Sequence, residues 1–182
     1  TNRKSLVELF GDANVKDVNV HLGEGMFCHG TQVKVDDENT LLMTWLDGTS
    51  KSNVDRIYFE GPKWSTPEGT GPSSSLKELE KANGRPFEMY GLLGWDYAGT
   101  IASWKSGNLE SVLPMSTTNR TIIRLSVEEV ALNDLTQEEE MQIWGASSLM
   151  SSNAVVQKLN PKPREFFMMF GLDKTCDAFD GM

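Results

Sequence analysis

SLVEL at residues 5–9 and SLKEL at residues 75–79 are two copies of one short word, and this repetition decides the expected fold. In both copies the Ser side chain can accept a hydrogen bond from the backbone N–H three residues later. The Glu at that position can reach back to the Ser N–H and complete a capping box. Gly11 follows the first copy and Gly84 the second, and each Gly suits the left-handed residue that ends a helix. The sequence therefore predicts two short helices that begin at matching words.

Apolar and polar residues alternate after each helix, which is the pattern of half-buried β-strands. The alternation falls at residues 18–22, 32–35, 40–46 and 56–59 after the first helix, and at 87–90, 99–104 and 121–127 after the second. Trp45 and Trp104 each stand near a strand end, just before a turn that contains Gly. The predicted fold is α+β: two helix-plus-antiparallel-meander units in tandem, followed by a C-terminal helix and strand.

The C-terminal helix is expected where Thr136 and Glu139 form another capping box. Its apolar side is expected to consist of Leu135, Met141, Ile143 and Trp144. A loop rich in Ser, Asn and Pro follows, with one helical turn expected around residues 155–159, before a last strand at 164–170.

The domain boundaries follow from these elements. We expect residues 1–61 to form the first unit, 62–74 a linker rich in Pro and Gly, 75–130 the second unit and 131–182 the C-terminal part, all within one compact domain. The predicted core, at equivalent places in the two units, is Leu6, Leu9, Leu76, Leu79, Trp45 and Trp104.

The charge balance limits the partners. The chain has 182 residues, with 17 Lys and Arg against 26 Asp and Glu, and a formal net charge of −9. A nucleic-acid backbone would repel it, and an anionic membrane would not attract it. No apolar run approaches the roughly 18 residues that cross a bilayer, so we expect no membrane-spanning segment. The expected partner is a protein or a small-molecule ligand with a basic surface.

Cys28 and Cys176 are the only cysteines in the sequence. They permit at most one disulfide, and the sequence leaves open whether it forms. His21, Cys28 and His29 have the chemistry of metal ligands, but their spacing is not that of a known zinc site. We therefore expect no metal and no cofactor.

Two carboxylates in glycine-rich turns offer a catalytic alternative. Glu24 lies between Gly23 and Gly25, and Asp96 follows Gly94 and Trp95. Together with the aromatic Trp64, two such acids are what a sugar hydrolase uses. The alternative function is therefore a hydrolase of a glycan or an ester, with Glu24 and Asp96 as acid and base.

The glycine-rich loops 23–30 and 91–99, with the linker around Trp64, are the expected binding surface, because loops on a sheet scaffold carry recognition. Its members are Trp64, Trp95, Asp96, Tyr97, Glu24 and Phe27. Aromatic side chains offer a large contact area at a small entropy cost. The other possibility, that Trp95 and Tyr97 pack against the second helix, stays open at this point.

Three segments carry a resemblance to a known group of proteins: residues 74–87, which contain SLKELEKANGRPF, the segment GWDYAGT at 94–100, and SWKSGNL at 103–109. They resemble a group of uncharacterised bacterial exported proteins, many of which carry lipoprotein signals. Residues 6–11, 23–25 and 42–47 resemble the first half of the same group. More distantly, the element order is similar to that of the β-lactamase-inhibitor protein and the small outer-membrane assembly lipoproteins, which act by binding other proteins.

The resemblance implies a place in the cell envelope, periplasmic or anchored to the outer membrane, with a signal peptide trimmed from the sequence and a lipid anchor in the precursor. It carries no activity and no catalytic residue. A cytoplasmic location stays open from the residues alone. The favoured function is a non-enzymatic binding module of the envelope.

Overall fold

The computed structural model describes residues 1–23, 26–116, 118–171, 176 and 179–180 of the chain. It divides the chain into two compact units. The first contains Thr1–Lys63, Ser116–Arg120 and Phe167–Met182, and the second contains Trp64–Met115 and Thr121–Phe166. The chain therefore passes between the units four times. Most of the predicted C-terminal part belongs to the second unit.

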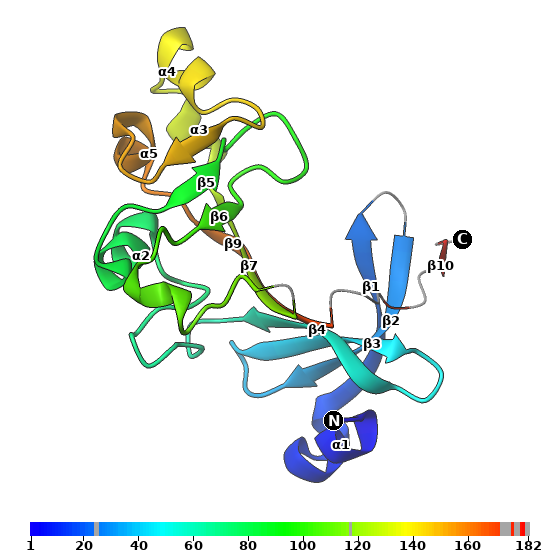
Figure 1. The fold of residues 1–182 in the computed structure, drawn as a ribbon. Helices are drawn as coiled ribbons and strands as arrows, with labels where there is room; N and C mark the ends of the chain where they lie inside the picture. The colour runs from blue at the N-terminus through cyan, green and yellow to red at the C-terminus, as the bar shows by residue number, and fades with distance from the viewer. Residues whose placement is uncertain (24–25, 117, 172–175, 177–178, 181–182) are drawn as a thin grey trace. The chain divides into compact units, whose positions relative to one another are not determined.

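The first unit is built on an antiparallel meander. Its elements are α1 (Arg3–Phe10), the 3-10 turn η1 (Asp12–Asn14), β1 (Val15–Gly23), β2 (Met26–Lys34), β3 (Thr40–Asp47) and β4 (Ser52–Glu60). Figure 1 shows the four strands in blue to cyan, each beside the next in the chain. The end of β9 (Lys162–Phe170) pairs with β4, and the short β10 (Phe179–Asp180) pairs with β2. The predicted strands of the first unit are confirmed.

The first helix begins earlier than its capping word predicts. The side chain of Asn2, not Ser5, is the N-cap, and its Oδ1 accepts a hydrogen bond from the Ser5 backbone N–H at 2.9 Å. Leu6 is buried as predicted, but Leu9 is 76% exposed, so its assignment to the core is wrong. A helix of eight residues covers the sheet with one short apolar stripe, and Leu9 lies outside that stripe.

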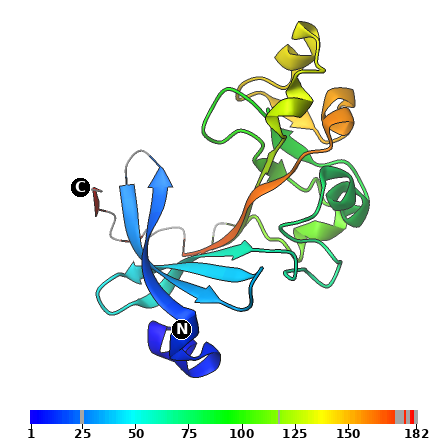
Figure 2. The same ribbon diagram turned by 180° about the vertical axis from the view of Figure 1, so that it is seen from behind.

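The second unit holds the remaining elements. They are α2 (Leu76–Asn83), β5 (Glu88–Tyr90), β6 (Ile101–Ser103), the 3-10 turn η2 (Asn108–Glu110), β7 (Asn119–Ser126), α3 (Glu129–Leu132), α4 (Gln137–Gln142), β8 (Ser148–Met150) and α5 (Ala154–Leu159). They do not form the predicted second meander. β5 lies between β6 and β8 in a separate three-stranded sheet, while β7 lies beside β9. β7 and β9 each contain residues of both units, and Figure 2 shows the two strands side by side.

The second helix begins and ends where its sequence predicts. Ser75 and Glu78 form the capping box, and Gly84 takes the left-handed conformation after the last turn, with φ of 74°. Leu76 and Leu79 are fully buried, and Trp104 is 1% exposed. The ring of Trp104 meets that of Phe87 edge-on, with centroids 5.2 Å apart. These side chains form the core of the second unit.

Asn83 fixes the end of α2 to its neighbours. Its buried amide nitrogen donates to the carbonyl oxygens of Arg85 at 2.9 Å and Trp104 at 3.0 Å, and its amide oxygen accepts from the Leu109 N–H at 3.3 Å. One side chain thus binds three backbone groups, among them the buried Leu109 N–H.

The protein therefore has an α+β fold with antiparallel sheets. The tandem repetition of one helix-plus-meander unit is not confirmed, because β5 and β6 lie in one sheet and β7 in the other. Across the described residues, no helix is both long and apolar enough to span a membrane.

Candidate functional site

The loop between β5 and β6, residues 91–99, is fixed at both ends by backbone hydrogen bonds. The Leu92 N–H donates to the Ile143 carbonyl at 2.7 Å, and the Leu125 N–H donates to the Gly99 carbonyl at 2.9 Å. Gly99 has φ of 74°, and a Cβ on it would lie 1.9 Å from the Leu125 carbonyl oxygen. Only Gly allows this close approach. The loop is thus held by backbone hydrogen bonds to Ile143 at one end and to Leu125 at the other.

Three aromatic rings follow one another at this loop. The ring of Trp95 meets Tyr90 edge-on at 5.3 Å and Tyr97 edge-on at 5.5 Å, measured between centroids. Trp95 is half-buried, whereas Tyr97 is 56% exposed. Tyr97 is therefore not buried against the second helix, the possibility that the sequence left open. It presents a ring that is held in place from one side and open to solvent on the other.

Arg124 supports the Tyr97 ring from β7. The centre of its guanidinium lies 5.2 Å from the ring centroid, within the range of a cation–π contact. Its Nη1 donates to Glu165 Oε2 on β9 at 2.8 Å, so the guanidinium is itself held in place. The sequence does not predict a role for Arg124 or Glu165, because nothing in the local pattern shows which residues of β7 and β9 lie close to the loop.

Asp96 lies between Trp95 and Tyr97 in the chain, and its side chain is exposed. Its backbone carbonyl accepts a hydrogen bond from Arg164 Nη2 at 3.2 Å. Glu24, its predicted catalytic partner, lies outside the described residues. The hydrolase therefore stays a prediction.

Trp64 begins the second unit and is half-buried at the start of a closed loop. The Thr66 N–H donates to the Thr70 carbonyl at 2.7 Å, and the two Thr hydroxyls lie 2.9 Å apart. A Cβ on Gly71 would lie 1.9 Å from the Trp64 carbonyl oxygen. The predicted linker thus folds back on itself over residues 64–71.

Phe27 belongs to the first unit, and its position corrects a prediction. Residues 26–30 are part of β2 and not of a loop, because they pair with β1 in antiparallel fashion, with one shift of register between Phe27 and Met26. Phe27 is half-buried, with its ring 5.0 Å from that of His21. The predicted surface thus draws on residues of both units, and Trp95, Asp96 and Tyr97 are the members that share one loop.

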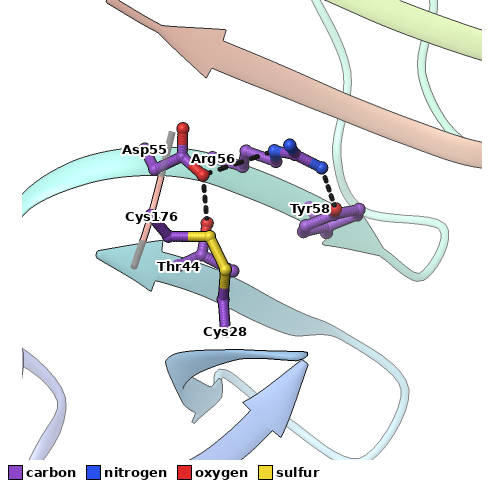
Figure 3. Close-up of a disulfide and its surroundings, with 6 residues drawn as sticks. All are labelled: Cys28, Thr44, Asp55, Arg56, Tyr58 and Cys176. Carbon is purple, nitrogen blue, oxygen red and sulfur yellow. Dashed lines mark hydrogen bonds and ion pairs between the residues drawn. A yellow bond between two sulfur atoms is a disulfide. The ribbon is translucent and has the colours of Figure 1, made fainter. Parts of the chain in front are cut away.

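The two cysteines form a disulfide within the first unit (Figure 3). Cys28 and Cys176 are both buried, with Cα atoms 6.1 Å apart. Beside the bond lies the buried carboxylate of Asp55, which accepts a hydrogen bond from Thr44 Oγ1 at 3.1 Å and pairs with Arg56 Nε at 3.3 Å. A buried charge of this kind is tolerated because it is paired and hydrogen-bonded.

The disulfide bears on two further points. Since disulfides persist where the surroundings are oxidising, it is consistent with such a compartment. It also removes Cys28 from the candidate metal ligands, because a bonded sulfur is not a thiolate. The part of the chain that the structure describes contains no group of three or more His, Cys, Asp or Glu arranged to hold a metal ion.

No family model, no curated protein and no solved structure matches this chain. The resemblance to bacterial exported proteins, and the more distant similarity to envelope proteins that bind other proteins, therefore stay predictions. The candidate site is defined by its geometry alone.

Proposed function

We propose that this chain is a non-enzymatic binding module of the bacterial cell envelope, which recognises a protein partner through the loop at residues 91–99. The observation that carries the proposal is the exposed Tyr97 ring, fixed between Trp95 and Arg124.

The geometry suits recognition because the ring is already in place before a partner arrives. A Tyr side chain has few rotatable bonds, and the contacts with Trp95 and Arg124 restrict them further, so little entropy is lost on binding. Tyr, Trp and Arg are also the residues that most often dominate the binding energy of protein interfaces. Trp95 and Tyr97 of the loop, together with Arg124 of β7, bring all three residue types to one place.

The location is part of the same proposal. A buried disulfide that joins β2 to the C-terminal segment supports folding in an oxidising compartment such as the periplasm. The resemblance to exported lipoproteins supports the same place, with a lipid anchor in the precursor. We propose the periplasm, or the periplasmic face of the outer membrane, as the site of action.

The test is the recovery of a partner from envelope extract by the purified protein, compared with two variants. Tyr97→Ala removes the exposed ring and should reduce recovery about tenfold. Leu9→Ala removes an even more exposed apolar side chain from the first unit and should leave recovery unchanged. Both variants should melt within about 2 °C of the parent protein, because surface substitutions change stability little. Equal recovery by all three proteins would refute the proposal.

A further inference from the structure

Two exposed apolar side chains lie where the sequence predicts the buried side of a helix. Met141 is 67% exposed and Trp144 is 51% exposed, whereas Ile143 between them is fully buried. α4 ends at Gln142, and Ile143 leaves the helical conformation with φ of −106° and ψ of 7°. The chain therefore turns Ile143 into the core and leaves Met141 and Trp144 at the surface. This corrects the prediction that all of them form the apolar side of the helix.

Trp144 lies against the loop that carries Tyr97. A Cβ on Gly94 would lie 2.5 Å from the indole Nε1 and 2.6 Å from Cε2, so the ring rests on the Gly94 backbone. The Gly145 N–H donates to the Leu93 carbonyl at 2.8 Å and fixes the two segments together. Figures 1 and 2 both show this loop beside the chain that leaves α4. We use the name Trp144 face for the exposed side chains of Trp144 and Met141 together with the Gly94 backbone on which the Trp144 ring rests.

The segment that carries Met141 and Trp144 is strongly acidic, while Arg124 and Arg164 lie against the neighbouring loop at residues 91–99. The sequence has no Lys or Arg from residue 125 to residue 157, and it has six acidic residues there: Glu128, Glu129, Asp134, Glu138, Glu139 and Glu140. Glu139 is engaged with the Thr136 cap and with Lys158 Nζ at 3.0 Å. The side chains of Glu138 and Glu140 are exposed on α4, directly before Met141.

We propose that the Trp144 face binds a polypeptide segment that is both basic and apolar, an amphipathic segment of the protein partner. This inference rests on the proposed function and names the chemistry of the partner. Apolar side chains of the segment would cover Trp144 and Met141, and its Lys or Arg side chains would meet Glu138 and Glu140. A second copy of this chain would bring acidic residues against acidic residues, which opposes self-association at this face.

The charge and the apolar rings have separate effects that an experiment can resolve. Burial of Trp144 and Met141 supplies affinity that salt hardly changes. The acidic side chains mainly raise the association rate, and salt screens their effect at distances beyond about 10 Å at 0.1 M. The proposed segment should therefore bind with an affinity that falls, but does not vanish, as salt is added.

The probe is a fluorescent amphipathic peptide of about 18 residues, built from Leu and Lys at helical spacing. Its binding to the disulfide-bonded protein of residues 1–182 is followed by fluorescence anisotropy. We expect saturable binding that weakens between about 50 mM and about 500 mM NaCl. Trp144→Ala should weaken binding about tenfold, and Met141→Ala about threefold. The double variant Glu138→Gln/Glu140→Gln should weaken it at low salt and not at high salt.

Matched controls lie outside the face. Leu9→Ala and Glu110→Gln change an exposed apolar and an exposed acidic residue, and both should bind like the parent protein. Met141→Ala and the double Gln variant alter only exposed side chains, so they test the proposal even where Trp144→Ala fails to fold.

Several results would overturn the inference. A matched peptide of Leu and Glu that binds as tightly as the Lys peptide would refute the basic partner. Unchanged binding by Met141→Ala and by the double Gln variant would show that the peptide does not bind at the Trp144 face. Sedimentation that shows a dimer lost in Met141→Ala would assign the face to a second copy instead. Tyr97-dependent recovery of an envelope protein without binding of the Lys peptide would leave the proposed function intact and refute this inference alone.

Discussion

Removal of the disulfide should cost the first unit a large part of its stability. Cys28 and Cys176 are 148 positions apart, so the bond restricts a long loop in the unfolded chain. In the loop-entropy model, a closed loop of this length corresponds to about 5 kcal/mol when the whole chain is unfolded. The variant to make is Cys28→Ala/Cys176→Ala, because Ala introduces no buried hydroxyl beside Asp55.

The division into two units reduces this figure when only the first unit unfolds. The second unit then stays folded and holds residues 64–166 together. The flexible part of the loop shrinks to residues 28–63 and 167–176, which corresponds to about 4 kcal/mol in the same model. We therefore expect a loss of about 4 to 5 kcal/mol in the free energy of unfolding of the first unit.

Urea unfolding of the parent protein and of the double variant measures this loss, and hydrogen exchange with mass spectrometry locates it. Faster exchange should appear in β2 and β3, while α2 and β5 should exchange as before. The parent protein treated with a reductant should match the double variant. A loss below about 1 kcal/mol would refute the loop argument, since the model gives several times that value. Equal acceleration in both units would refute their independence.

Three further predictions concern single side chains. Trp104→Ala should lower the free energy of unfolding by about 3–5 kcal/mol, because the ring is 1% exposed. Leu9→Ala should change it by less than about 0.5 kcal/mol. Urea unfolding of both variants compares the two losses, and similar losses would contradict the assigned burial. Asn83→Ala should cost about 1–3 kcal/mol, because it leaves the buried Leu109 N–H without its partner. Thermal melting that matches the parent would show that water replaces the amide. The pKa of Asp36 lies well below its usual range, because Lys63 and then the Asn39 amide bind its carboxylate. These contacts stabilise the folded protein fully above a pH of about 4, where the carboxyl of the unfolded chain ionises. The stabilisation is lost as the pH falls from there through the lowered pKa of the folded state. NMR titration of the Asp36 carboxyl carbon should give this lowered midpoint, and a midpoint near 4 would contradict it.

Local signals predicted the helices well where no competing signal lay nearby. Ser75 and Glu78 form the predicted capping box, and so do Thr136 and Glu139, because each depends on residues three positions apart. The first helix differs because Asn2, an equally good cap, precedes Ser5 and extends the helix by one turn.

The sequence does not predict contacts that depend on the pairing of strands far apart in the chain. Alternation predicted a strand at 121–127, but not that it would lie beside β9 instead of joining a second meander. The support of Tyr97 by Arg124 and Glu165 depends on this pairing, so no local pattern contains it. Helical spacing likewise placed Trp144 on a buried side, because the spacing does not show that α4 ends two residues earlier.

The pairing of β9 with β4 also means that the sheet of the first unit can be completed only late in synthesis. β4 has β3 on one edge and β9 on the other, and Phe167 and Met169 pair with Tyr58 and Arg56. During translation, Phe167 and Met169 are added to the chain only after all of residues 64–166. Until then β4 presents a row of unpaired N–H and C=O groups, the feature by which unfinished sheets associate with one another. Any folding of β1 to β4 before Phe167 has reached the compartment where the chain folds therefore leaves this edge of β4 exposed.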